Sequence, residues 1–174
     1  MKIVLAYIIE IILYIIIVWL IGYISVLIHE TGHAIGFMCA TKSRDWRITI
    51  GSGRKILESK RFTVNLLPFG GLFKPGYNGQ MSIKRNKLSM LAGGPLATLL
   101  LLIPLILLRI VKPGETDIVS AGMLKRIIGF ASEYNLVLLV VTVLPFSYPF
   151  GVNKGMESDG LQIWRQLKRN DRDK

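Results

Sequence analysis

Three long apolar stretches dominate the pattern of hydrophobic and polar positions along this chain. The first covers residues 3–28, where Glu10 is the only charged residue. As a helix, such a stretch would measure about 39 Å, which is enough to cross a bilayer with some tilt. The second covers residues 88–111, and the third covers residues 127–146 and carries Glu133 and Asn135 near its start. The first stretch is too long for the apolar part of a signal peptide, so we predict three permanent transmembrane helices.

A polar segment, residues 41–86, separates the first two apolar stretches. It contains W-R-I-T-I, R-F-T-V-N-L-L and G-G-L-F-K-P-G, which alternate or carry β-branched residues and are bounded by glycine and proline. Such phrases are typical of short strands and hairpins rather than of helix. The chain has no internal repeat and no low-complexity linker. We therefore predict one domain over residues 1–174, an all-α polytopic membrane fold with a three-helix core and a β-hairpin-containing insert that is cytoplasmic or membrane-associated.

The charge distribution predicts how this core is oriented. Half of the residues are hydrophobic (51%), yet the formal net charge is +11, so the charges are segregated from the apolar stretches. Residues 41–87, the insert and the residue after it, hold eleven of the 22 basic residues and the tail after Phe150 holds six, whereas four lie from Arg109 to Arg126. The positive-inside rule then places insert and tail in the cytoplasm and the N-terminus outside. Attraction to anionic lipid explains the basic residues, and we expect the bilayer rather than nucleic acid as the partner.

Candidate chemistry lies at the end of the first apolar stretch, which reads H-E-T-G-H from His29 to His33. On a helix, two histidines four residues apart project from one face and can share one Zn²⁺. Glu30 lies about 100° further round and could act as a general base toward water at that metal. The alternative is that both histidines are packing or capping groups. Polar groups next to hydrocarbon are costly without partners, which favours a functional site.

Catalytic zinc usually has three protein ligands, and no third histidine exists in the chain. Glu10 and Glu133 are expected near the outer ends of their helices, close to Lys125 and Arg126, and Cys39 lacks helical register with the histidines. The carboxylates on the cytoplasmic side are Asp45, Glu58, Glu157 and Asp159. Asp159 stands in S-D-G, immediately before a helical stretch at residues 161–167. Spacing alone leaves open whether Asp159 is a ligand or whether Ser158 or Asp159 merely caps that helix.

Four motifs, in this order, carry a family resemblance. They are H-E-T-G-H at 29–33, L-P-F-G-G-L-F-K at 67–74, A-G-G-P-L-A-T at 92–98, and L-P at 144–145 followed by S-D-G at 158–160. Over nearly its whole length the chain resembles the site-2 protease family of intramembrane zinc metalloproteases. The resemblance implies that His29, His33 and Asp159 hold one Zn²⁺ per chain and that Glu30 is the catalytic base.

The chain also departs from the family's pattern. Thr98 and Thr142 stand where the family usually has asparagines that are thought to help bind the substrate backbone, and the segment 146–158 is longer than the family's usual link. These departures concern substrate handling more than metal binding.

The resemblance implies an intramembrane zinc endopeptidase that cleaves a membrane peptide or a single-span protein near the cytoplasmic face of a bacterial cell membrane. An accessory membrane protein could contribute to the choice of substrate. Two alternatives remain open. The first is a catalytically inactive relative that binds membrane peptides without cutting them. The second is a membrane haem or metal-transfer protein, which would need neither Glu30 nor the Asp159 motif.

Overall fold

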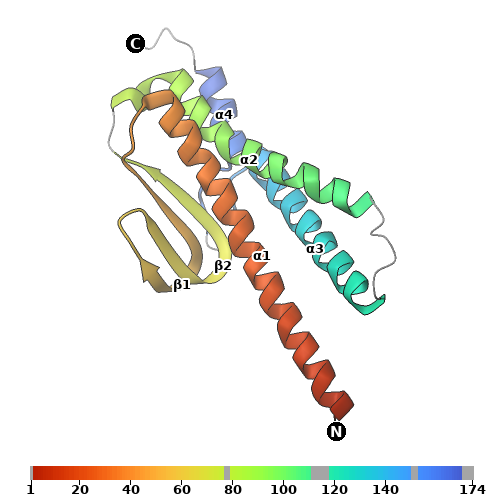
Figure 1. Ribbon diagram of the computed structural model, residues 1–174. Helices are drawn as coiled ribbons and strands as arrows, with labels where there is room; N and C mark the ends of the chain where they lie inside the picture. Colours follow the sequence, from red (N-terminus) through yellow and green to blue (C-terminus); the bar gives the residue numbers. More distant parts are fainter. Residues whose placement is uncertain (1, 77–78, 111–117, 150–152, 170–174) are drawn as a thin grey trace.

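The computed structural model describes residues 2–76, 79–110, 118–149 and 153–169. Its elements, in chain order, are helix α1 (Lys2–Thr41), strands β1 (Trp46–Glu58) and β2 (Phe62–Pro75), the short 3-10 helix η1 (Gly79–Ser82), and helices α2 (Lys84–Ile110), α3 (Ile118–Val143) and α4 (Asp159–Lys168). The helices and the sheet lie on opposite sides of α1, with α2 and α3 on one side and both strands on the other (Figure 1).

Three of the helices are long and apolar enough to cross a membrane, as the hydropathy pattern predicts, but several of their boundaries differ from the predicted ones. The candidate spans are Val4–Thr41, Lys84–Ile110 and Gly122–Val143. The helix of the first span continues beyond residue 28, because nothing in residues 29–41 breaks a helix. The third helix begins at Ile118 rather than at 127, because Lys125 and Arg126 interrupt the apolar stretch but not the helix. The helix ends at Val143, before Pro145, since a proline disfavours helical backbone at the residue before it. Val111, the predicted end of the second span, lies outside the described residues.

Helices α1 and α2 pack closely because small residues face each other at their crossing. A Cβ added to Gly32 would collide with the backbone of Gly93, one added to Gly93 would collide with Gly32, and one added to Gly36 would collide with the carbonyl of Ser89. Small residues at such a crossing let helix backbones approach without voids, which is how membrane helices gain packing energy. The close approach places the end of the H-E-T-G-H segment directly against α2.

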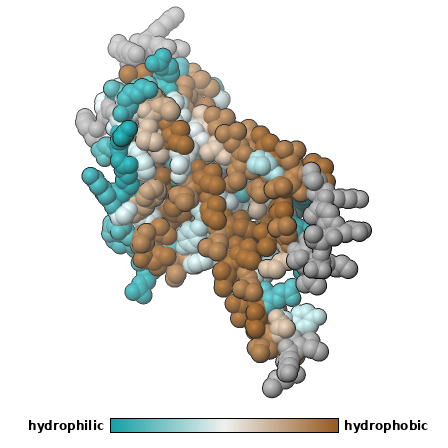
Figure 2. Space-filling view, in the orientation of Figure 1, coloured by the Kyte–Doolittle hydropathy of each residue, from teal (hydrophilic) through white to brown (hydrophobic). Residues whose placement is uncertain are grey.

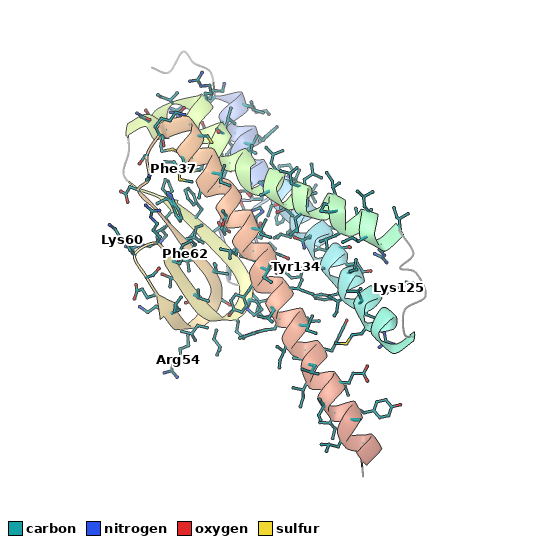
Figure 3. The ribbon with its side chains drawn as sticks, viewed as in Figure 1. Phe37, Arg54, Lys60, Phe62, Lys125 and Tyr134 are labelled. Atoms are coloured by element: carbon teal, nitrogen blue, oxygen red, sulfur yellow. The ribbon has the colours of Figure 1, made fainter. Side chains whose placement is uncertain are left out.

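The insert forms the expected strands, as a two-stranded antiparallel sheet with irregular register. Residues 46–50 of β1 pair with 71–75 of β2, and residues 48–50 also pair with 62–64 of the same strand, so β2 curls around β1. The core beneath the sheet holds Val26 and Ala34 of α1 with Ile48 and Ile50 of β1. Phe37 of α1 lies on the side that faces the sheet and Phe62 (Figure 3), and its ring centroid is 5.8 Å from that of Phe73.

The surface divides into an apolar and a basic region. Large apolar side chains are exposed along α1, α2 and α3, whereas hydrophilic residues gather along the outer edge of the sheet and at the end where α4 lies (Figures 1 and 2). The sheet also exposes apolar residues, among them Leu66, Leu67 and Phe69. The N-terminal end of α1 and the adjoining ends of α2 and α3 point the opposite way (Figure 1). Exposed apolar side chains along long helices are typical of a protein whose helices face lipid.

Candidate metal centre and active site

Three candidate metal ligands converge at the middle of the molecule. His29 and His33 are both buried on α1, and their Nε2 atoms lie 3.2 Å apart. The Oδ2 atom of Asp159 lies 3.2 Å from Nε2 of His29 and 3.3 Å from Nε2 of His33. Ligand atoms held about 2.0–2.1 Å from one tetrahedral zinc ion are separated by about 3.3 Å. The three side chains therefore fit a zinc ion without rearrangement.

The outer ring nitrogen of each histidine has a protein partner of its own. The Nδ1 atom of His33 donates to the carbonyl of Met90 at 2.8 Å, and Nδ1 of His29 lies 2.9 Å from Oγ1 of Thr98. The Thr98 hydroxyl donates to the carbonyl of Gly94 at 3.2 Å, so it accepts from the imidazole. Both histidines are thus held in the tautomer that turns a lone pair on Nε2 toward Asp159. Such partners orient metal-binding imidazoles and raise their basicity.

Space for these rings is left by a glycine of α2. A Cβ added to Gly94 would collide with Nε2 of His33 and lie 2.8 Å from Nε2 of His29. Any larger residue at this position would displace both imidazoles. The double glycine of A-G-G-P therefore serves two purposes: Gly93 allows the helices to cross closely, and Gly94 makes room for the candidate metal site.

Asp159 reaches the histidines from the first residue of α4. The cap of that helix is Ser158, whose Oγ accepts from the backbone N–H of Leu161 at 3.1 Å, so the carboxylate of Asp159 is free to face His29 and His33. A Cβ on Gly160 would collide with the carbonyl of Val143, so glycine lets α4 begin directly against the end of α3.

Glu30 lies beside the three candidate ligands. It is buried and lines a cavity of about 380 Å³ together with His29, His33 and Asp159. Its carboxylate accepts a hydrogen bond from the backbone of Phe73 on β2. A Cβ added to Gly71 would collide with that carboxylate, so the glycine lets the strand pass close to it. Glu30 is therefore not one of the three candidate ligands, as the sequence predicts, but it lines the cavity that they line.

Another part of the cavity wall comes from the segment 146–158, whose role the motifs do not reveal. Ser147 and Glu157 form a β-bridge, and the backbone N–H of Tyr148 donates to the carbonyl of Met156 at 2.9 Å, so the ends of the segment form a small hairpin. Tyr148, Asn153 and Met156 line the cavity. Burial, and then the negative charges of Asp159 and Glu30, raise the pKa of Tyr148 to about 12, which keeps its phenol protonated. In the sequence, the feature that could have pointed to this wall of the cavity is the unusual length of the segment.

The other carboxylates considered as a third ligand lie elsewhere. Glu133 pairs with Arg109 of α2 at 3.3 Å rather than with Lys125 or Arg126, because α3 begins earlier and carries residue 133 further along the helix. Glu157 lines the cavity but pairs with Arg165. Glu58 pairs with Lys55, and Glu10 shares a separate pocket with Arg126. Asp45 lines another cavity, together with Arg44 and Arg47, and Cys39 is exposed. Among the described residues, the one cluster with metal-site geometry is His29, His33 and Asp159.

The two threonines that replace asparagines have different surroundings. Thr98 is fully buried behind His29 and does not line the cavity. Thr142 does line it, but its hydroxyl donates to main-chain carbonyls of its own helix, those of Leu138 and Leu139. Thr98 therefore supports a candidate ligand, whereas Thr142 presents little polar surface to the cavity.

Replacing Thr98 with valine is expected to weaken zinc binding by roughly 10- to 100-fold, as is typical when an outer partner of a ligating histidine is lost. Valine has nearly the same shape but cannot accept from Nδ1 of His29. Zinc affinity of the purified variant would be measured by competition with a chromogenic chelator. Thr98→Ser keeps the hydroxyl and should restore most of the affinity. Wild-type affinity in the valine variant would show that the hydroxyl does not orient His29.

Comparison with protein families agrees with this geometry. A model of peptidase family M50 matches residues 7–167, which include every candidate ligand and Glu30. Comparisons with curated proteins and with solved structures each gave no significant match. The chain belongs to peptidase family M50, the family of site-2 proteases, and is thus a membrane protein of the metallopeptidase class.

Proposed function

We propose that this chain is an intramembrane zinc endopeptidase that hydrolyses a peptide bond of a membrane-embedded or membrane-associated protein near the cytoplasmic face. The observation that carries the proposal is the convergence of two imidazole nitrogens and one carboxylate oxygen, with a separate carboxylate, Glu30, beside them. Three ligands and an independent base are the groups that metal-assisted hydrolysis needs.

The residues would divide the chemistry as follows. His29, His33 and Asp159 would hold the ion, which when bound would polarise the scissile carbonyl and make water more acidic. Glu30 would take a proton from the attacking water and deliver it to the leaving amine. Water would reach the buried site through the cavity, whose walls include the polar side chains of Tyr148 and Asn153. The phenol of Tyr148 donates to the carbonyl of Val141 at 3.4 Å, and it would exchange this long hydrogen bond for one to the substrate.

The substrate would bind as an extended segment along β2. Residues 71–75 use one edge to pair with β1, while Gly70, Gly71, Leu72 and Phe73 line the cavity next to Glu30. An added strand would be held by main-chain hydrogen bonds, which read conformation more than sequence. A transmembrane helix hides its carbonyls in its own hydrogen bonds, so local unwinding must come before cleavage.

The proposal is tested by co-expressing the chain with membrane peptides encoded beside its gene and then assaying isolated membranes. Cleavage is expected to stop when a chelator removes the metal and to return when zinc is added. A preparation that contains one zinc ion per chain yet cleaves no membrane peptide would instead indicate the inactive, peptide-binding relative. A haem spectrum in place of zinc would contradict the proposed class.

We also propose that the N-terminus is outside and the sheet and tail are cytoplasmic. A reporter inserted near Ser59 or fused after Lys174 should then report the cytoplasm, and one inserted near Glu115 the outside, because the basic residues concentrate in the insert and tail. Glu115 and Lys174 lie outside the described residues. The opposite pattern of reporter activity would put the metal centre at the outer face.

A further inference from the structure

A second polar cavity lies where the sheet meets the end of α1. Its volume is about 610 Å³. The charged side chains that line it are Arg44, Arg47, Lys60, Arg61 and Lys74, with Asp45 as the one acid. Lys60 lies at the outer edge of the sheet, away from Arg54 at the far end (Figure 3). We refer to this cavity as the basic groove.

The positive charges of the basic groove outnumber its negative charges, because five basic side chains face one carboxylate, that of Asp45. Glu58, outside the groove, also interacts with Arg47. Arg47 and Lys74 are direct cross-strand partners in the sheet. Like charges in that position have Cβ atoms about 5 Å apart and destabilise a sheet. The ion pairs of the described residues are His29 and His33 with Asp159, Lys55–Glu58, Arg109–Glu133 and Arg165–Glu157, so none includes a cation of the groove. An anion bound between the two strands would remove this repulsion.

Contacts with α1 indicate the depth of the groove in the membrane. Pro68, at the far end of the sheet, packs on Gly22, and Leu66, Leu67 and Phe69 around it are exposed apolar residues. At the groove, the indole N–H of Trp46 donates to the sulfur of Met38 at 3.3 Å. Gly22 and Met38 are separated by about 24 Å along a helix. The apolar end of the sheet therefore lies beside the apolar span, and the groove lies where α1 leaves it, at the level of lipid headgroups.

We propose that the basic groove binds the phosphate group of an anionic phospholipid in the cytoplasmic leaflet. One arginine guanidinium can donate two parallel hydrogen bonds to two oxygens of a phosphate. Three arginines from different parts of the insert line the groove: Arg44, Arg47 and Arg61. The guanidinium of Arg61 lies 5.0 Å from the ring centroid of Trp46, and an aromatic residue at this depth is typical of a membrane interface. A lipid fits better than an acidic peptide because the far end of the same sheet exposes Leu66, Leu67 and Phe69 beside the apolar span, where acyl chains would lie.

This site would be coupled to the candidate active site through β2. Pro75 lines both cavities, and Lys74 in the groove directly follows Phe73, whose backbone bonds Glu30. A bound headgroup would therefore fix the strand that runs past Glu30. Lipid binding itself does not depend on peptide hydrolysis, so it can be tested whether or not the proposed peptidase activity is found.

The test measures the affinity of the full-length purified chain for phosphatidylglycerol and phosphatidylcholine by native mass spectrometry of mixed micelles. The wild type should retain one phosphatidylglycerol in preference to phosphatidylcholine. Each basic residue near an anionic group contributes roughly fivefold in affinity, so Arg47→Gln/Lys74→Gln should bind about 30-fold more weakly.

The matched control is Arg85→Gln/Arg169→Gln, which removes the same charge from exposed positions at α2 and after α4 that do not line the groove. Equal losses in both double variants, or no loss in either, would overturn the proposal, provided that circular dichroism melting shows both to be folded. Inorganic phosphate that binds as tightly as the lipid would identify a free-phosphate site instead. Tighter binding of an acidic peptide than of phosphatidylglycerol would also contradict the proposal.

Discussion

Replacing Glu30 with glutamine is expected to abolish peptide cleavage while leaving zinc content and membrane insertion unchanged. The side chains are nearly isosteric, and the amide can still accept the backbone hydrogen bond that Phe73 makes to the carboxylate. An amide cannot take a proton from water, so the loss in turnover should be roughly 10³-fold or more, within the range of general-base catalysis. Turnover and zinc per chain would be measured on the same purified sample.

Glu10→Gln is the matched control, because Glu10 is a carboxylate on the same helix but lies exposed and far from the cavity. It should cleave at the wild-type rate. Turnover retained in Glu30→Gln would refute the assignment of Glu30 as the base, and the buried carboxylate would then need a structural explanation.

Removing any one of the three candidate ligands should remove the metal. His29→Ala, His33→Ala and Asp159→Ala each leave two ligands, which hold zinc far less tightly than three, and the loss should reach most of the bound zinc after dialysis. Zinc per chain would be measured by atomic emission on the purified variants. Activity should fall with the metal, and added zinc should not restore it fully.

Glu157→Ala provides the comparison for the third ligand. Glu157 also lines the cavity and lies two residues from Asp159, but its carboxylate pairs with Arg165. Zinc content should be unchanged in this variant. If Glu157→Ala loses the metal and Asp159→Ala keeps it, the third ligand has been assigned to the wrong carboxylate.

Helix content, the strands of the insert and the pairing of His29 with His33 could be predicted because they depend on local periodicity. Hydropathy indicated where apolar stretches end, but not where helices end, since α1 and α3 both extend through polar residues. Asp159 was ambiguous from the residues alone because a capping residue and a ligand occupy neighbouring positions. The structure separates the two roles by assigning the cap to Ser158.

Other features depend on contacts between distant segments and could not be predicted from local patterns. Thr98 faces His29 across 69 positions of the chain, and nothing in its neighbourhood on α2 indicates that its hydroxyl serves an imidazole. The pairing of β1 with two parts of β2 likewise depends on how the strand curls. The segment 146–158 has an informative length but no motif that predicts a hairpin over the cavity.

The reach of Asp159 to His29 across 130 positions also has a consequence for how the molecule holds together. A metal ion at this point would act as a cross-link between the first helix and the last, closing a loop that includes most of the chain. Cross-links that close long loops remove the most conformational entropy from the unfolded state. The free energy of zinc binding would then contribute to the stability of the fold, so that loss of the metal would lower both activity and the free energy of unfolding.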